Sequence, residues 1–283
     1  MPTVIPITSL VDDPRLAPYA NQRDAHLRAP HLNPDATSRP GGSFIAEGEL
    51  VVRTLLESSY PTRSILVREG YLPKVMPGAV AAESRTGADI PIFVAPQDVL
   101  DLIVGFHIHR GVLACAERPE PPPLLGTVLE RARTLILLED LSNHDNVGGI
   151  FRNAGCLAPP ERTAVVLSPR SCDPLYRKSL RVSIGHALRV PFVQAGDWRG
   201  ALDEVSASGF TLAAMETEPV AVDIGSVVWP GRTAIVLGAE GPGLRPETLA
   251  RCGLRVRIPM APGADSLNVA SACGIALSWM RLV

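Results

Sequence analysis

Five short runs of apolar, largely β-branched residues constrain what this chain can fold into more than any other feature. They occupy residues 134–138, 163–167, 210–214, 233–237 and 255–258. Runs that are apolar at most consecutive positions are typical of strands buried on both faces of a parallel sheet. Segments with helical spacing of apolar residues lie between and after them, at residues 147–156, 198–206 and 267–282. The alternation predicts an α/β domain, in which helices cover a parallel sheet and ligands bind at the carboxyl ends of the strands.

The first part of the chain has a similar but smaller pattern. Apolar positions at helical spacing occupy residues 44–58, strand-like runs lie at 64–67 and 92–95, and another helix is expected at 99–106. A proline cluster near residues 119–123 predicts an extended spacer, because prolines fix φ and remove backbone donors. The predicted divisions are an irregular or partly helical leader (1–43), a small α/β domain (44–118), a Pro-rich linker (119–127) and a larger α/β domain (128–283).

Charge gives little sign of a polyanionic partner. The chain has 27 basic and 29 acidic residues and a formal net charge of -2, which disfavours diffuse binding to nucleic acid. However, 25 of the basic residues are arginines, and arginine suits bidentate phosphate contacts. Genomic base composition can produce the same bias, so this observation alone decides nothing.

Compartment is indicated by what the sequence does not contain. The five cysteines form no CxxC pair, and the first residues lack the basic start and apolar core of an export signal. No stretch reaches the roughly 18 apolar residues that a membrane span needs. We therefore expect a cytoplasmic protein with reduced, buried thiols and no membrane association.

Three loops place glycine and polar residues just after a predicted strand. The first, residues 138–155, carries Asn146 and Arg152. Asn146 is a suitable N-cap for a helix that begins at Val147, and Arg152 lies nearly two turns later on a different side of that helix. A capping asparagine and a solvated arginine explain this segment as well as a functional pair does.

The second loop, residues 235–244, follows a buried strand with Gly238, Gly241 and Gly243. Glycines let the backbone approach a ligand closely, although a tight turn is the simpler explanation. The spacing matches neither the dinucleotide fingerprint nor the phosphate loop. Glu240 would also repel a diphosphate.

The third loop, residues 258–277, leads into an apolar helix that is rich in small residues. Asp265, Ser266 and Asn268 lie at the start of that helix. Asp265 or Ser266 could act as a simple helix cap. Each loop alone is therefore a weak indication of function, and only their combination is informative.

Together, the loops resemble the three motifs of the SpoU (TrmH-like) branch of the SPOUT superfamily of RNA methyltransferases. The matching segments, in chain order, are NVGGIFRNA, VLGAEGPGL and IPMAPGADSLNVASA. The resemblance covers residues 134–283, and both the order and the separations of the motifs agree with the family. The segment FIAEGE, which begins at Phe44, resembles the family's N-terminal RNA-binding module less specifically.

This resemblance implies methyl transfer from S-adenosylmethionine to a ribose 2′-hydroxyl of ribosomal or transfer RNA, with S-adenosylhomocysteine as product and no metal. It implies a parallel-sheet methyltransferase domain whose C-terminal segment forms a trefoil knot, an exception to unknotted topology. A small α/β RNA substrate-binding domain would precede it. The family also implies a homodimer in which each site borrows residues from the other subunit.

The resemblance assigns roles to individual residues. Main-chain positions that hold the adenosine portion of the cofactor, with two adjoining residues, correspond to Leu237, Gly238, Ile258, Met260 and Leu267. Polar residues around the methyl group and target ribose correspond to Asn146, Arg152, Glu240, Ser266 and Asn268. The first set is the predicted cofactor site, and the second is the predicted catalytic set.

The chemistry requires a group that accepts the proton of a weakly nucleophilic ribose hydroxyl. A guanidinium resists deprotonation, so we predict that Arg152 clamps the phosphate next to the target ribose. Glu240, Asn146, Ser266 or that phosphate are the candidates to help the proton leave.

The segment between the first and second motifs, residues 169–192, is rich in basic residues. We predict that Arg177, Lys178 and Arg181 bind the RNA backbone together with Arg152. The alternative is a solvated basic face without a function. We expect no metal site, because His144 has no second histidine at ligand spacing and His107 and His109 are typical of surface residues.

Two other classes of function remain open at this point. A noncatalytic RNA-binding or ribosome-assembly factor could keep the fold, although all five predicted catalytic positions carry the family's residues. A nicotinamide-dependent oxidoreductase would agree with the α/β pattern, but the chain lacks its glycine fingerprint.

Overall fold

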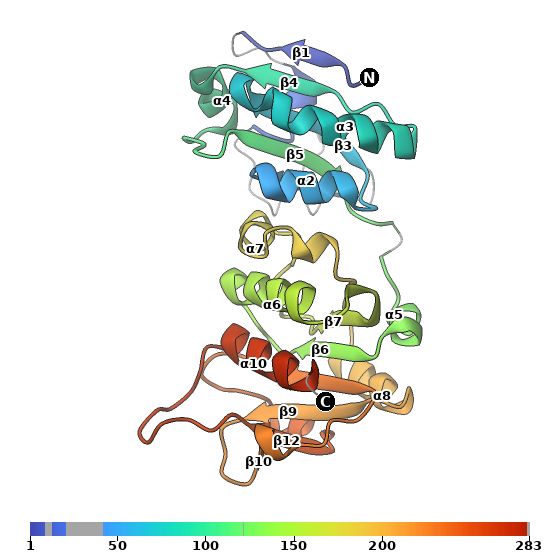
Figure 1. Ribbon diagram of the computed structural model, residues 1–283, viewed down its shortest axis with the longest axis vertical. Coiled ribbons are helices and arrows are strands. Elements are labelled where there is room, and N and C mark those ends of the chain that lie inside the picture. The colour runs from blue at the N-terminus through green and yellow to red at the C-terminus, as the bar shows by residue number, and fades with distance from the viewer. Residues whose placement is uncertain (9–12, 21–41, 121, 282–283) are drawn as a thin grey trace. The chain divides into compact units, whose positions relative to one another are not determined.

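The structure is a computed structural model that describes residues 1–8, 13–20, 42–120 and 122–281. They form two compact units (Figure 1): an N-terminal unit of Met1–Pro122 with Leu175–Leu188, and a C-terminal unit of Pro123–Pro174 with Arg189–Val283. The change of unit after Pro122 falls within the proline cluster. The return of Leu175–Leu188 to the N-terminal unit was not predicted, and the predicted domain limits at residues 43, 118 and 127 stay predictions.

The N-terminal unit contains a five-stranded sheet in the order β1-β4-β3-β5-β2. Strands β1, β4 and β3 are parallel, and β5 is antiparallel to β3 and β2. The strands are β1 (Val4–Pro6), β2 (Ser43–Glu47), β3 (Thr62–Arg68), β4 (Ile92–Ala95) and β5 (Val112–Glu117). The helices are α2 (Glu49–Glu57), α3 (Leu72–Thr86), α4 (Gln97–Val104) and α7 (Arg177–Val182), with short 3-10 turns at Pro14–Leu16, Glu69–Tyr71 and His186–Leu188.

Residues 44–58 do not form the continuous helix that their apolar spacing suggests. Residues Ser43–Glu47 are strand β2, and helix α2 begins only at Glu49. Gly48 lies between them with φ of 98°, a backbone conformation that glycine adopts readily and a helix does not contain. The expected strands at 64–67 and 92–95 and the expected helix at 99–106 correspond to β3, β4 and α4, whereas strand β5 and helix α3 were not predicted.

The leader contributes structure that the sequence did not indicate. Val4–Pro6 form an edge strand paired with Ile92, Phe93 and Val94 of β4, whereas irregular or partly helical structure was expected. The short turn at Pro14–Leu16 agrees with partial helicity. Residues 9–12 and 21–41 of the predicted leader lie outside the described residues.

The C-terminal unit confirms the predicted α/β class. Its seven strands pair in the order β10-β12-β9-β11-β6-β7-β8, and every pair is parallel. The strands are β6 (Thr134–Leu138), β7 (Thr163–Leu167), β8 (Phe192–Gln194), β9 (Thr211–Glu216), β10 (Val222–Asp223), β11 (Thr233–Leu237) and β12 (Leu254–Arg257). The helices are α5 (Leu125–Arg131), α6 (His144–Leu157), α8 (Trp198–Ala207), α9 (Pro246–Leu249) and α10 (Val269–Arg281), with 3-10 turns at Pro160–Arg162 and Ile224–Ser226. The predicted C-terminal knot stays a prediction.

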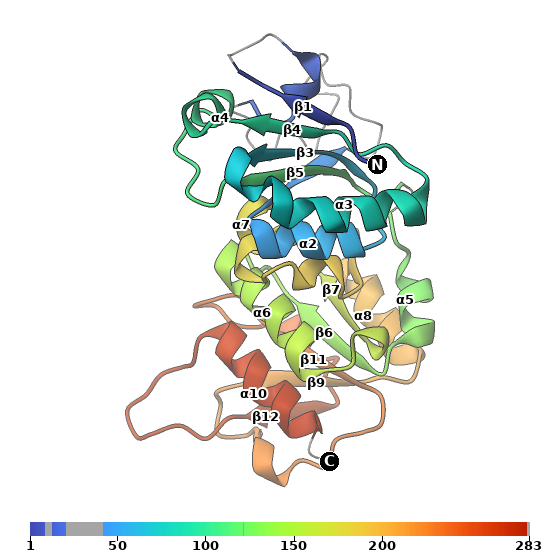
Figure 2. The same ribbon diagram turned by 45° about the horizontal axis from the view of Figure 1, so that its top comes forward.

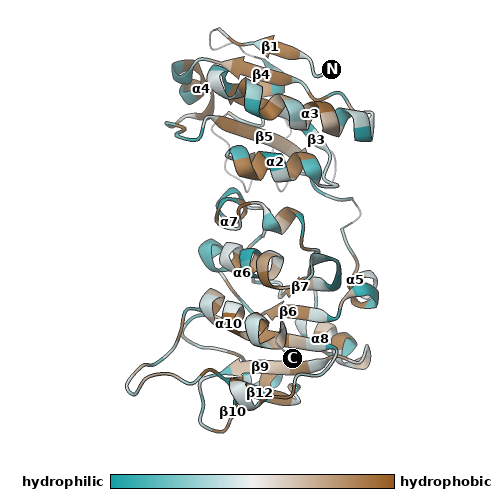
Figure 3. Ribbon diagram, in the orientation of Figure 1, coloured by the Kyte–Doolittle hydropathy of each residue, from teal (hydrophilic) through white to brown (hydrophobic). Residues whose placement is uncertain are grey.

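Helices cover both faces of this sheet (Figure 2). Leu135 and Leu137 of β6 belong to a buried cluster that also contains residues of α5 and α8. Successive strand residues point to opposite faces, so the buried Ile136 and Leu138 lie on the other face, against which α6 and α10 pack. This two-sided burial is the physical reason why the strand runs are apolar at consecutive positions. Figure 3 shows comparably apolar strands, β4 and β5, in the N-terminal unit.

Thiol burial differs from the expectation. All five cysteines are free, but only Cys115 and Cys273 are buried, and Cys156 is exposed. Burial raises the pKa of Cys115 to about 11, so this thiol stays protonated and unreactive at neutral pH. Among the residues that the structure describes, no helix has the length and apolar character to cross a bilayer.

Candidate active site

A cavity of about 490 Å³ opens at the carboxyl ends of β9, β11 and β12. This volume is typical of small-molecule sites. All five predicted cofactor residues line it, namely Leu237, Gly238, Ile258, Met260 and Leu267. Three of the predicted catalytic residues, Glu240, Ser266 and Asn268, line it as well. The structure therefore brings together the second and third motifs, which the sequence separates.

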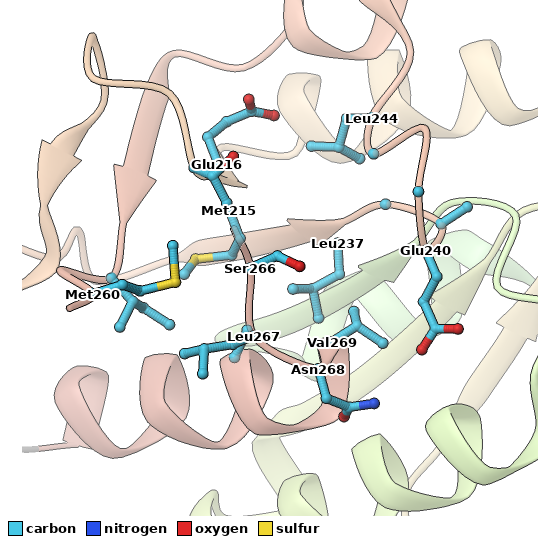
Figure 4. A pocket seen from close by; sticks show the side chains of 17 residues that line it. Met215, Glu216, Leu237, Glu240, Leu244, Met260, Ser266, Leu267, Asn268 and Val269 are labelled. Atoms are coloured by element: carbon cyan, nitrogen blue, oxygen red, sulfur yellow. The ribbon is translucent and has the colours of Figure 1, made fainter. Parts of the chain in front are cut away.

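The lining changes in character from one end of the cavity to the other (Figure 4). Met215 and Met260 lie at one end, and Glu240 and Asn268 lie at the other. Ser266 points into the space between these ends. Met215 and Glu216, the last residues of β9, and the following Thr217 also line the cavity but were not predicted, because only the order of the strands places them beside β11.

The loop after β11 gives the cavity a wall of exposed backbone. The amide of Gly243 donates to the carbonyl of Ala239 at 3.0 Å, which folds the loop back on itself. Gly241 and Gly243 have φ of 87° and 68°, so both positions favour glycine. The chain also passes so close to Gly238 that a Cβ there would lie 2.5 Å from the carbonyl oxygen of Gly243.

Three polar side chains from the three motifs form one hydrogen-bonded set. The backbone amides of Ala270 and Ser271 donate to Asn268 Oδ1, at 2.9 and 3.3 Å. Asn268 Nδ2 then donates to Asn146 Oδ1 at 2.8 Å, and Asn146 Nδ2 donates to Glu240 Oε1. The start of α10 therefore fixes the orientation of both amides, and the second amide directs an N–H group at the Glu240 carboxylate.

Asn146 is not the N-cap that the sequence suggested. Helix α6 begins at His144, three residues earlier than expected, and Asn143 is its cap, accepting from the amide of Asp145 at 2.9 Å. Asn146 lies inside the helix and is only 5% exposed. Its buried amide forms hydrogen bonds with Glu240 and Asn268 instead of capping the helix. Similarly, Asn268 rather than Asp265 or Ser266 caps the first turn of α10.

Arg152 does not lie among the residues that line the cavity. It is exposed on α6 and follows Asn146 by six positions, which corresponds to about 120° around the helix axis. Within this subunit, the structure therefore brings four of the five predicted catalytic residues together and leaves Arg152 outside.

The predicted RNA-binding residues of α7 have partners in the N-terminal unit. Arg177 and Arg181 both approach the carboxylate of Glu47, at 3.9 and 3.4 Å. The Arg177 guanidinium also lies over the ring of Phe106. Lys178 is exposed on the same helix. Two residues of the basic segment, Arg177 and Arg181, are therefore part of an ion-pair cluster.

Glu139, a residue that sequence reasoning passed over, anchors the far end of the cavity loop. It is 1% exposed and accepts hydrogen bonds from Trp198 Nε1 at 2.5 Å, from the amide of Arg245 at 2.7 Å, and from Thr248 Oγ1. Its own amide donates to the carbonyl of Leu237, where the loop begins. A carboxylate directly after a fully buried strand is the one sequence signal for this role.

The next residue, Asp140, holds the side chain of Arg245. Its carboxylate accepts from Arg245, from Arg170 at 2.5 Å and from Ser168 at 2.8 Å. Burial alone would raise the pKa of Asp140, but the hydrogen bonds from Arg170, Arg245 and Ser168 hold it below its usual 3.8. Asp140 has φ of 56°, a left-handed conformation that aspartate tolerates better than most residues.

Because this carboxyl has a lowered pKa in the folded protein, its contribution to stability is complete above pH 3.8 and is lost as the pH falls further. We expect Asp140→Asn to lower the free energy of unfolding at pH 7. The difference from the wild type should stay constant down to about pH 5 and narrow below pH 4. Tryptophan fluorescence in denaturant titrations measures this, since Trp198, Trp229 and Trp279 all belong to the C-terminal unit. A difference that stays constant down to pH 3 would contradict the assignment.

Metal ligands are not a feature of the described part of the chain. Within those ranges, no three histidine, cysteine, aspartate or glutamate side chains are placed to hold an ion. His107 Nδ1 instead lies 2.6 Å from Asp101, and its ring packs edge-on against His109. Fold and site together define an α/β domain that holds a small ligand at the carboxyl edge of a parallel sheet.

Comparison with known proteins places this domain in a family. The SpoU rRNA methylase family matches residues 133–278. A tRNA/rRNA methyltransferase of Mycobacterium tuberculosis, described as uncharacterized, is 39% identical over 270 residues, covering 94% of this chain and 88% of the relative. The 23S rRNA (guanosine-2′-O-)-methyltransferase RlmB of Acinetobacter baylyi is 33% identical over 198 residues, covering 66% and 77%. The chain belongs to the SpoU rRNA methylase family, which confirms the resemblance of its three motifs.

Solved structures agree with this fold. The AdoMet-bound rRNA methyltransferase of Sinorhizobium meliloti superposes with a TM-score of 0.77 over 99% of this chain and 98% of that one, at 22% identity. The SpoU methyltransferase AviRb of Streptomyces viridochromogenes, in complex with AdoMet, gives a TM-score of 0.74 over 95% and 96%, at 23% identity. Both similarities extend across the N-terminal and C-terminal units.

Proposed function

We propose that the protein transfers a methyl group from S-adenosylmethionine to a ribose 2′-hydroxyl of ribosomal or transfer RNA. The observation that carries the proposal is the set Asn146, Glu240 and Asn268, hydrogen-bonded at the polar end of a cavity that all five predicted cofactor residues line. The relatives named for 23S rRNA guanosine-2′-O methylation and for tRNA/rRNA methylation support the same chemistry. A merely RNA-binding factor would have no need of this arrangement.

The cavity fits the proposed cofactor in size and in character. Leu237, Ile258 and Leu267 supply apolar contacts, while Gly238 exposes backbone at a position where a Cβ has no room. Flat adenine rings suit such a site, because backbone groups can bind their edges between apolar side chains. When bound, S-adenosylmethionine supplies an electrophilic methyl group, and S-adenosylhomocysteine is the product.

At the polar end, we assign separate roles to the side chains. Glu240 accepts the proton of the ribose hydroxyl, because it is the carboxylate of the hydrogen-bonded set. Asn146 holds Glu240 in place through Nδ2, and Asn268 holds Asn146. Ser266 lies between the cofactor end and Glu240 and can bind the ribose through its hydroxyl. Alignment of the reacting atoms at about 3 to 3.5 Å is the purpose of this rigidity.

Arg152 completes the site only if it comes from a second copy of the chain. In its own subunit it is exposed and is not among the residues that line the cavity. We therefore infer a homodimer in which Arg152 of each subunit clamps the RNA phosphate beside the other subunit's target ribose. Gel filtration and light scattering test this directly, and a monomer that retains methyl transfer would contradict it.

The clamp predicts a specific result for Arg152→Lys. Lysine keeps the charge but loses the planar pair of donors, so we expect single-turnover methylation to slow about tenfold or more. Binding of S-adenosylhomocysteine should not change. Arg131→Lys, an exposed arginine on α5, provides the control. Full single-turnover activity of Arg152→Lys would rule out a bidentate clamp.

Two measurements decide between the classes of function. Calorimetric titration should show binding of S-adenosylhomocysteine and no binding of NAD, and binding of NAD alone would favour an oxidoreductase. Mapping of 2′-O-methylation across total RNA from cells with and without the gene should show one or a few lost sites. An RNA that binds without becoming methylated would favour the noncatalytic assembly factor.

The proposal also covers the partners and the compartment. We propose a cytoplasmic location, because the proposed substrates are ribosomal and transfer RNA. Arg177, Lys178 and Arg181 stay candidates for RNA contact, with Lys178 the most accessible of the three. Their test is the salt dependence of RNA affinity, which should flatten when the three charges are removed.

A further inference from the structure

A second cavity, of about 590 Å³, lies in the C-terminal unit, and arginines form much of its wall. Arg170 follows strand β7, and Arg199 lies in the first turn of α8, directly after β8. Arg245 precedes α9 and Arg251 follows it. We call the cavity defined by these four residues the arginine cleft.

The arginine cleft and the cofactor cavity share one edge of the sheet. In the order β12-β9-β11-β6-β7-β8, the cofactor cavity lies at the carboxyl ends of the first three strands and the arginine cleft at those of the last two. The loop after β11 borders both, because Leu244 lines the cofactor cavity and Arg245 lines the cleft. The helix that carries Asn146 follows β6, between the two halves. An RNA strand whose target ribose reaches Glu240 would therefore extend naturally toward the cleft.

The charge inside the cleft is not fully compensated. One carboxylate, Asp140, is shared by the guanidinium groups of Arg170 and Arg245. Arg199 is exposed and makes no ion pair with any described residue. Arg251 pairs with Asp203 at 2.8 Å, so it contributes least. Among the three remaining arginines, Arg170 and Arg245 thus share one carboxylate, and Arg199 is paired with none of the described acids.

Two carboxylates line the cleft itself, and each lies at the start of a helix. Asp197 is the N-cap residue of α8, and its carboxylate lies over the first turn, where a Cβ on Gly200 would meet it at 2.5 Å. Glu247 lies in the first turn of α9. Carboxylates at these positions interact favourably with the free backbone N–H groups of the helix ends, so they offset the arginines only in part.

We propose that the arginine cleft binds backbone phosphates of the substrate RNA next to the target nucleotide; this inference rests on the proposed function. Guanidinium groups match phosphate oxygens in pairs. Asp140 holds two of them in a fixed position, so little side-chain freedom is lost when the phosphate arrives. The cleft also explains how a chain with a net charge of -2 can bind RNA, since the contact is local.

The chain provides a matched control at the opposite edge of the same sheet. A third cavity there is also lined by arginines, among them Arg133 and Arg162. Arg133 directly precedes β6, and Arg162, the last residue of the 3-10 turn, directly precedes β7, so both lie at the amino ends of the strands. If charge alone decided RNA binding, the two cavities would contribute equally. The proposal requires that only the arginine cleft contribute.

The test compares Arg170→Ala/Arg199→Ala with Arg133→Ala/Arg162→Ala in the full-length chain. Arg245 is kept, because Glu139 and Asp140 use it to hold the cofactor loop. Affinity for deproteinised bacterial 23S rRNA, and for bulk tRNA as a second probe, is measured from 50 to 300 mM KCl. At low salt, we expect the cleft variant to bind RNA about 10- to 100-fold more weakly than the wild type. The slope of log K for RNA binding against log salt concentration should be smaller in magnitude by about 1.5 to 2. S-adenosylhomocysteine affinity should match the wild type, and thermal stability should fall only slightly, because the Arg170 side chain that pairs with Asp140 is largely exposed and Arg245 still holds that carboxylate.

Each outcome of this comparison decides the question. A loss confined to the cleft variant supports the proposal. The RNA-binding role of the cleft would be wrong if both variants lost RNA affinity equally, or if the cleft variant lost none while the wild type methylated RNA. Either result would leave the proposed function intact. A wild-type protein that neither binds nor methylates either RNA would overturn both. If an acidic protein bound the wild type but not the Arg170→Ala/Arg199→Ala variant, and RNA did not compete with it, the cleft would be a site for a protein partner. That result would overturn the proposal.

Discussion

Gly238→Ala is expected to weaken binding of S-adenosylhomocysteine by about 100-fold or more. The added Cβ would lie within 2.5 Å of the Gly243 carbonyl oxygen and of the Leu244 amide nitrogen, and these are backbone atoms that cannot rotate away. The loop after β11 must therefore move, and it forms one wall of the cofactor cavity. Strand β11 itself is buried between β6 and β9, so we expect the C-terminal unit to stay folded.

Calorimetric titration measures this effect, and thermal unfolding shows whether the fold persists. Gly253→Ala is the matched control, since a Cβ at Gly253 has no atom within 4 Å and the residue has no left-handed backbone. That variant should bind the cofactor product within about twofold of the wild type. If Gly238→Ala bound S-adenosylhomocysteine normally, the close approach in this loop would not define the cofactor site.

Five of the seven strands in the C-terminal unit were predictable because their signal is local, whereas the short strands β8 and β10 were not predicted. Residues 134–138, 163–167 and 233–237 coincide with β6, β7 and β11, since a strand that is buried on both faces must be apolar at consecutive positions. The apolar spacing in residues 44–58 wrongly predicted one continuous helix, for a related reason. Apolar residues of a strand and of a helix can follow one another without a break, and the turn at Gly48 is the only local sign that separates them.

Contacts between distant segments could not be predicted in the same way. Met215 enters the cofactor cavity because β9 is the neighbour of β11, and strand order depends on the packing of the whole sheet. The partners of Glu139 lie at Trp198, Arg245 and Thr248, which no spacing in the sequence relates to it. The predicted site residues came from motif resemblance, and their hydrogen-bonded arrangement came only from the structure.

The position of Arg152 illustrates the limit of a motif. The motif groups it with Asn146, but the helical repeat turns the two side chains about 120° apart. A single subunit therefore cannot present both side chains to one cavity from the same helix face. The pairing of Arg177 and Arg181 with Glu47 is a comparable case, since a run of basic residues does not reveal which carboxylates the fold places beside it.

Asn146→Asp should slow methyl transfer by about 100- to 1,000-fold at neutral pH, the loss typical of one removed hydrogen-bond donor in an active site. In the native protein, Asn146 Nδ2 donates to Glu240 and Asn146 Oδ1 accepts from Asn268. Aspartate keeps the acceptor but replaces the donor with a second negative charge that faces the Glu240 carboxylate. The two carboxylates repel each other, so Glu240 leaves the position from which it accepts the ribose proton.

Single-turnover methylation with saturating cofactor isolates this step from binding. S-adenosylhomocysteine affinity should change less than about threefold, because Asn146 does not line the cofactor cavity. Asn143→Asp is the matched control: it makes the same chemical change three residues earlier, where only the oxygen of the side chain is used to cap α6 and aspartate caps equally well. An equal loss of rate in both variants would indicate a general effect of negative charge on RNA binding. A normal rate in Asn146→Asp would show that Glu240 does not need the amide, and the proposed proton acceptor would have to be sought elsewhere.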